Sequence, residues 1–158
     1  MRRGLRVRGP AAAAALALVA ALPGCQSTAA PAPAVLAERS AVHCPLREPL
    51  AARGLVQIDS AAQWQARLAQ PEAALLGTPV AWAGQRVLVL GLGPQPTGGH
   101  ALEWVPPLHV DGRGTLVVQA RHRPPAPDRM VTQAFTEPCL LLLLPRQGWQ
   151  RAELSWLP

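Results

Sequence analysis

The side chains of this chain that can do covalent or acid–base chemistry are its cysteines, histidines, serines and acids. The four histidines are His43, His100, His109 and His122, and they lack the spacing of metal ligands, since a zinc site needs three or four converging groups. No Gly-x-Ser-x-Gly surrounds a serine, and no glycine-rich loop could hold phosphate. The acids are scattered. We therefore expect no catalytic residue, no metal and no cofactor, so the chain is not predicted to be an enzyme.

Cys25 follows a segment with the pattern of an export signal. Four arginines among the first eight residues precede an apolar run over 11–22. A basic flank before a short apolar core is typical of secretory signals, and the run is shorter than the ~20 residues of a membrane-spanning helix. Leu22-Pro23-Gly24-Cys25 resembles a lipobox, the processing site of bacterial lipoproteins. The resemblance implies that the signal peptide 1–24 is removed and that Cys25 carries a lipid with palmitate-type chains; an ordinary signal peptide with a coincidental cysteine is the alternative.

Residues 25–41 are predicted to be a tether between this lipid and a globular domain. They are rich in Ala and Pro without an apolar period, and Pro31 and Pro33 favour an extended, semi-rigid chain. Gln26, rather than Asp, after the cysteine resembles the sorting signal for the outer membrane of Gram-negative cells. We expect the protein on the periplasmic face of that membrane.

The net charge of +6 comes mostly from the signal peptide. Removing its four arginines leaves 11 basic and 9 acidic residues, a net charge of +2. No long basic stripe with interleaved aromatic residues is present, so nucleic acid is not an expected partner. Residues 42–158 suffice for one domain with one core.

Cys44 and Cys139 are the cysteines of this domain. In an exported protein an isolated pair most simply forms one disulfide. Two buried thiols or a redox pair are the alternatives, although no Cys-x-x-Cys supports redox chemistry.

The elements before residue 85 are a short strand and helices. Residues 55–58 predict a strand, and residues 61–68 predict a helix with a capping box formed by Ser60 and Gln63. A second helical turn is expected over 71–76, where Gly77 follows.

After residue 85 the pattern predicts a sheet. Residues 87–93 and 140–144 are nearly continuous apolar runs, which suit strands covered on both faces. Residues 100–105 and 115–121 predict two strands joined by a turn at 111–114.

Residues 145–148 predict a turn, and the alternation after it predicts a strand that closes an antiparallel hairpin. The expected fold is therefore mainly β (α+β), an antiparallel twisted sheet or a small β-sandwich with one or two short helices packed on it. Among the five tryptophans we expect Trp64, Trp104 and Trp156 in the core, and Trp82 and Trp149 at half-exposed turns.

An ordered series of motifs carries a family resemblance. It comprises Val87–Gly91, Gln95–His100, Pro124–Pro127 and Val131–Pro138, with Pro79–Trp82 upstream. The series resembles the C-terminal domain of PrcB, a protease-complex lipoprotein subunit. Where the family usually has Tyr and Asp, this chain has His100 and Ala81.

The loop in this series is the candidate partner-binding site: Pro96, Thr97, Gly98, Gly99 and His100. Prolines hold the approach extended, and the glycines permit positive φ so that the chain turns tightly. A stiff, exposed loop binds a partner with little loss of entropy. The alternative is that these residues are only a hairpin turn.

The resemblance implies a non-enzymatic, membrane-anchored binding module that associates with an exported protease or stabilises it. Gln95–His100 and Arg123–Pro125 also partly resemble the loops of chagasin-type inhibitors of cysteine proteases. A protease inhibitor and an envelope structural lipoprotein without a protease link are therefore the alternative functions.

Overall fold

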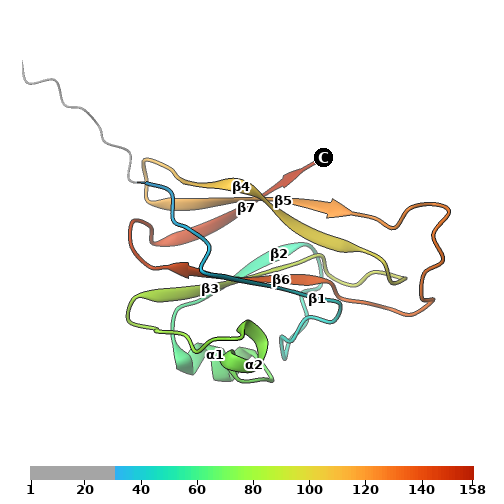
Figure 1. Ribbon diagram of the computed structural model, residues 1–158, viewed down its shortest axis with the longest axis horizontal. Helices are drawn as coiled ribbons and strands as arrows, with labels where there is room; N and C mark the ends of the chain where they lie inside the picture. Colours follow the sequence, from blue (N-terminus) through green and yellow to red (C-terminus); the bar gives the residue numbers. More distant parts are fainter. Residues whose placement is uncertain (1–30) are drawn as a thin grey trace, which may run out of the picture.

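Two β-sheets pack face to face, and two short helices cover the outer face of one of them (Figure 1). The computed structural model describes residues 31–158, so the predicted signal peptide 1–24 and the predicted acylation site Cys25 lie outside the described residues. The elements are β1 (Ala37–Ala41), β2 (Gly54–Ile58), α1 (Ala61–Arg67), α2 (Glu72–Leu76), β3 (Gln85–Gly91), β4 (Ala101–Val110), β5 (Thr115–Arg123), β6 (Cys139–Pro145) and β7 (Arg151–Leu157).

The strands form one four-stranded and one three-stranded sheet. The first has the order β1-β6-β3-β2 and is antiparallel throughout. The second has the order β4-β5-β7, in which β4 and β5 are antiparallel whereas β5 and β7 are parallel. The mainly β fold with short helices is confirmed, in its sandwich form.

The continuous apolar runs of β3 and β6 are explained by their position in the middle layer. Leu88 and Leu142 point into the core between the two sheets, together with Leu116 of β5. Val89 and Leu141 point to the other face, where Trp64 of α1 covers them. Because both faces of these strands are buried, neither shows the alternation of a half-exposed strand.

The first helix begins where the capping pattern predicts. The Ser60 hydroxyl accepts a hydrogen bond from the Gln63 amide at 3.2 Å, and the Gln63 side chain accepts one from the Asp59 amide at 2.7 Å. The only side chain of α1 that is buried is Trp64, whose indole donates to the Gln70 carbonyl. The helix is thereby held against the outer face of the four-stranded sheet.

The prediction of a closing hairpin between β6 and β7 is wrong. The chain turns after β6 as expected, but β7 joins the other sheet and runs parallel to β5. The reason is that β6 has no free edge, because β1 pairs with one side of it and β3 with the other. The segment after the turn therefore crosses to the free edge of β5.

Three of the tryptophans differ from the expectation. Trp149 was expected at a half-exposed turn but is 3% exposed, because it inserts into the core where the chain crosses between the sheets. Its indole donates to the Pro145 carbonyl at 2.8 Å. Trp104 and Trp156, expected in the core, are only partly buried. Trp104 lies near the edge strand β1, where it donates a hydrogen bond to Glu38.

The last part of the predicted tether belongs to the domain. Residues 37–41 form β1 and pair with β6 over its first five residues, from Ala41 opposite Cys139 to Ala37 opposite Leu143. Their polar side chains face outward at the sheet edge, so the composition that suggests a tether is also that of an edge strand. Within residues 31–158, no helix has the length and apolar character needed to cross a bilayer.

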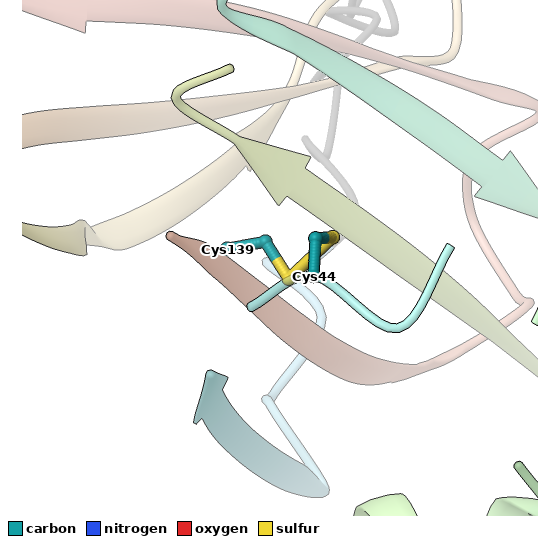
Figure 2. Close-up of a disulfide and its surroundings, with 2 residues drawn as sticks. All are labelled: Cys44 and Cys139. Atoms are coloured by element: carbon teal, nitrogen blue, oxygen red, sulfur yellow. A yellow bond between two sulfur atoms is a disulfide. The ribbon is translucent and has the colours of Figure 1, made fainter. Parts of the chain in front are cut away.

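Cys44 and Cys139 form the expected disulfide, with 5.2 Å between their Cα atoms (Figure 2). It joins the segment after β1 to the first residue of β6. The amide of Cys44 also donates to the Glu137 carbonyl at 2.9 Å, so the covalent link and the backbone contact lie together.

Candidate functional site

Three loops meet at one end of the sandwich. Gln95 in the β3–β4 loop and Thr136 in the β5–β6 loop exchange two backbone hydrogen bonds, of 2.8 and 3.0 Å. The amide of Glu137 donates to the carbonyl of Val42, which follows β1. We call the surface formed by residues 42–43, 95–100 and 130–137 the loop face. Figure 1 shows the long β5–β6 loop at the right-hand end of the molecule.

The two glycines of the predicted binding loop allow the loops to touch. The Gly98 amide donates to the Thr132 carbonyl at 2.9 Å, and a Cβ at Gly98 would lie 3.4 Å from Thr132 Cβ. Gly99 has a φ of 81°, and a Cβ there would lie 2.8 Å from Val131 Cγ1 and 3.0 Å from Pro125 Cβ. Positive φ is thus needed at Gly99 as expected, whereas Gly98 serves the close approach of the other loop.

Two threonines add side-chain links. Thr136 is buried at 4% exposure, and its hydroxyl donates to the Thr97 carbonyl at 2.9 Å. The Thr97 hydroxyl lies 3.3 Å from His100 Nε2. Pro96 is exposed at the tip. The predicted binding residues therefore form one loop that is bonded to its neighbour rather than a free hairpin tip.

A histidine pair lies beside this loop, and the spacing of the two histidines in the sequence does not predict it. His100 Nδ1 lies 2.9 Å from His122 Nε2, and the two rings stack with centroids 5.1 Å apart. On the far side, the Arg53 guanidinium lies 3.0 Å from His122 Nδ1. Burial lowers the pKa of His122 from its usual 6.5, and the charges of Arg53 and His100 lower it further.

The pair depends on a register shift that the sequence pattern does not reveal. Around the 111–114 turn Val110 pairs with Leu116, but beyond Pro106 and Pro107 the pairing moves by two residues, so that Leu102 lies opposite His122. Proline has no amide hydrogen for the ladder, which suits it to such an irregularity. The shift brings His122 to the side of His100.

Apolar side chains are concentrated on the loop face. Within residues 31–158, the large hydrophobic side chains that are exposed are Met130 at 98%, Phe135 at 76%, Val42 at 60% and Leu36 at 51%. The first three lie on the loop face. Leu36 does not, because its amide donates a hydrogen bond to the carbonyl of Leu143, near the other end of β6. A hollow of about 180 Å³ lies beside the loop face, lined in part by Val42, His100 and Pro138.

Within the described part of the chain, no group of three or more His, Cys, Asp or Glu side chains converges as a metal site would require. The arginines near the β5–β6 loop, Arg121, Arg123 and Arg129, are exposed, and Arg123 forms an ion pair with Glu103 at 2.8 Å. The loop face offers apolar side chains on a bonded backbone.

These features define a small β-sandwich domain with a disulfide and an apolar, three-loop end. Residues 86–145 match the family model described as PrcB C-terminal, which confirms the resemblance of the sequence motifs. This part of the chain is thus a PrcB C-terminal-like region. It runs from β3 to the end of β6 and contains both bonded loops, whereas Val42 and Arg53 lie outside it. Nothing among curated proteins or solved structures matches the chain.

Proposed function

We propose that this protein is a membrane-anchored, non-enzymatic binding module that docks an exported protease through its loop face and stabilises it. The observation that carries the proposal is that Met130, Phe135 and Val42, all more than half exposed, belong to loops that meet at one end of the domain. Clustered exposed apolar side chains, unlike scattered ones, mark interaction sites.

The bonding between the loops favours tight docking. The backbone that carries Phe135 is held by the two hydrogen bonds between Thr136 and Gln95. A partner that buries Phe135 therefore loses little backbone entropy on binding. Large side chains at the centre of an interface usually supply most of its affinity. Phe135 and Met130 are the expected anchors.

The class of partner comes from the family match. Residues 86–145 match the PrcB C-terminal family model. The sequence motifs resemble the same family, that of a protease-complex lipoprotein subunit, which supports an exported protease as the partner. The lipobox-like Leu22–Cys25 supports a lipid anchor, and Gln26 after it supports the periplasmic face of the outer membrane. The described chain begins (blue) at the end of the sandwich opposite the long β5–β6 loop (Figure 1). This arrangement would direct the loop face away from the membrane.

Docking is tested by capture of partners from detergent-solubilised envelope. The double variant Met130→Ser, Phe135→Ser should lose the partner, because it removes the apolar anchors without disturbing a buried group. Leu36→Ser is the matched control, since Leu36 is also exposed but lies away from the loop face. Equal capture by the double variant and the wild type would contradict docking through this surface.

The captured protein distinguishes the alternatives. A protease whose activity or lifetime falls without this chain would support the accessory role. Inhibition of a papain-like protease by the wild type, lost in the double variant, would indicate an inhibitor instead. Capture of envelope proteins alone would indicate a structural lipoprotein.

Anchoring is tested separately with Cys25→Ser. The wild-type product should begin at an acylated Cys25 and sediment with membranes, because a lipid with more than one chain binds a bilayer stably. The variant should keep its signal peptide or appear in the soluble fraction. An intact mass with Met1 retained in the wild type would refute the anchor.

A further inference from the structure

The contacts of the histidine pair permit one direction of hydrogen bonding. Arginine only donates, so His122 Nδ1 must accept from Arg53. A neutral imidazole carries one proton, which therefore lies on His122 Nε2 and is donated to His100 Nδ1. His100 must then carry its proton on Nε2 and donate it to the Thr97 hydroxyl. A hydrogen-bond chain therefore runs from Arg53 through both rings to the predicted binding loop.

A proton added to either ring breaks this chain. If His122 gains a proton, its Nδ1–H faces the Arg53 guanidinium, so that one donor meets another. If His100 gains a proton, its Nδ1–H faces the Nε2–H of His122. The first case also places two like charges, on His122 and Arg53, within hydrogen-bond distance. The hydrogen-bond chain is therefore complete only while both imidazoles are neutral.

The surroundings offer no compensation for an added charge. Arg53 reaches His122 from the β1–β2 connection. Its guanidinium carbon lies 4.9 Å from the centroid of the Trp156 ring of β7, which holds it there. On β5 the neighbours of His122 are Arg121 and Arg123, and on β4 the nearest acid, Glu103, is paired with Arg123. Within residues 31–158, no carboxylate forms an ion pair with either imidazole.

We infer that Arg53, His122 and His100 are positioning residues of the loop face, which hold the His100 ring against Thr97, and Thr97 in its docking conformation, while both rings are neutral and let the His100 ring shift on protonation. The inference rests on the docking function proposed above and adds its regulation by pH. Thr97 transmits the change, because its carbonyl accepts from Thr136 of the neighbouring loop. Acidification would then loosen both loops together.

The lowered pKa of His122 sets the sign of the pH effect. The folded protein binds this proton less readily than the unfolded chain does, so the stability of the fold is lower where the ring is protonated. The contribution of neutral His122 to stability is complete at a pH above 6.5, the usual pKa, and is lost as the pH falls through the lower pKa of the folded protein. Docking should weaken over the same range.

The positioning role is tested by NMR on the full-length chain in detergent micelles, from about pH 7.5 to about pH 5. At the upper pH both imidazoles should be Nε2–H tautomers, and the amides of Thr97 and Gly99 should then shift with the protonation of His122. In Thr97→Val, which lacks the hydroxyl, this coupling should disappear, and in Thr97→Ser it should return. An Nδ1–H tautomer at either ring, or loop amides that do not respond, would overturn the inference.

Capture of the envelope partner at the two pH values gives the functional readout. Wild-type capture should fall about fivefold or more at the lower pH, the scale of a modest coupling between sites. In His122→Gln, where the amide can accept from Arg53 and donate to His100, capture should fall less than in the wild type, because His100 is then the one ring of the pair that can gain a proton. His109→Gln changes an exposed histidine of β4 that is not part of the hydrogen-bond chain, and this variant should behave as wild type.

The two readouts separate the inference from the proposed function. If the wild type captures no partner at either pH while its loop amides follow His122, the docking function fails and the positioning role stands. If a partner is captured with the same pH dependence in His122→Gln as in the wild type, docking stands and the positioning role is refuted.

Discussion

At the scale of the residue, the loop face depends on a few buried or bonded polar atoms. Thr136 is 4% exposed and joins the two loops through both its backbone and its hydroxyl. A buried hydroxyl is tolerated only when its hydrogen bond is made. The loops are therefore linked at a point that a partner would not contact directly.

Thr136→Val keeps the shape of the side chain and removes this hydroxyl. The free energy of unfolding should fall by about 1 kcal/mol, because the Thr97 carbonyl loses its donor. Urea denaturation measures the change. Thr132→Val, on the same loop and exposed, should change stability by less than about 0.5 kcal/mol. Equal effects of the two variants would show that the Thr136 hydroxyl bond contributes nothing.

Asp111 shapes the β4–β5 turn through its charge. Its carboxylate accepts hydrogen bonds from the amides of Thr115 and Arg113 at 2.9 and 2.8 Å. Both bonds lower the pKa of Asp111, and the bond from Thr115 has the larger effect. Carbon-13 NMR of this carboxyl should give a midpoint below the usual 3.8. The contribution to stability should be present above that value and be lost as the pH falls through the folded pKa. A midpoint at or above 3.8 would contradict this role.

At the scale of the element, the position of β7 is decided by which sheet edges are free. Two side-chain contacts fix the crossing that leads to it. Arg86 of β3 donates to the Gln150 carbonyl at 2.7 Å, and its guanidinium lies 4.5 Å from the centre of the Trp149 ring. The Gln150 amide donates to the carbonyl of Gly114, the residue before β5. The segment between β6 and β7 is therefore bound to both sheets.

Asp59 supports this crossing from the end of β2. Arg86 Nε, on a side chain 11% exposed, lies 3.2 Å from its carboxylate, and Arg146 donates to its carbonyl. Asp59→Asn should lower the free energy of unfolding by about 1–3 kcal/mol, because the largely buried Arg86 loses its counter-charge.

The matched control for Asp59 is the exposed pair of Arg151 and Glu153, whose side chains are 62% and 65% exposed. Glu153→Gln should change stability by at most about 1 kcal/mol, as is usual for surface ion pairs. Thermal denaturation compares the two variants. An equal, small loss in both would show that Asp59 is not the counter-charge on which the crossing depends.

At the scale of the whole molecule, the disulfide joins positions 95 residues apart. Replacing both cysteines by alanine should lower the free energy of unfolding by about 4–5 kcal/mol, because the unfolded chain is no longer cross-linked. Denaturation in urea with and without a reductant measures the loss. The reductant should bring the wild type to the level of the double variant and leave the variant unchanged; a wild type insensitive to full reduction would contradict the estimate.

Much of the architecture follows from local pattern. The apolar runs of β3 and β6 predict strands buried on both faces, because a strand that exposes neither face needs no polar alternation. The capping box before α1 predicts the start of the helix, since its hydrogen bonds are made within a few residues. The cysteine pair and the Pro-Thr-Gly-Gly motif are likewise visible in the sequence, and the motif led to the family that residues 86–145 match.

Other features were decided by the tertiary structure. The alternation of β7 predicts a strand, but which strand it pairs with depends on β1 already occupying the edge of β6. The meeting of His100 and His122 depends on the two-residue shift at Pro106 and Pro107. A sequence period reports which face of an element is buried, whereas partner strands and contacts across loops depend on competition among segments far apart in the chain.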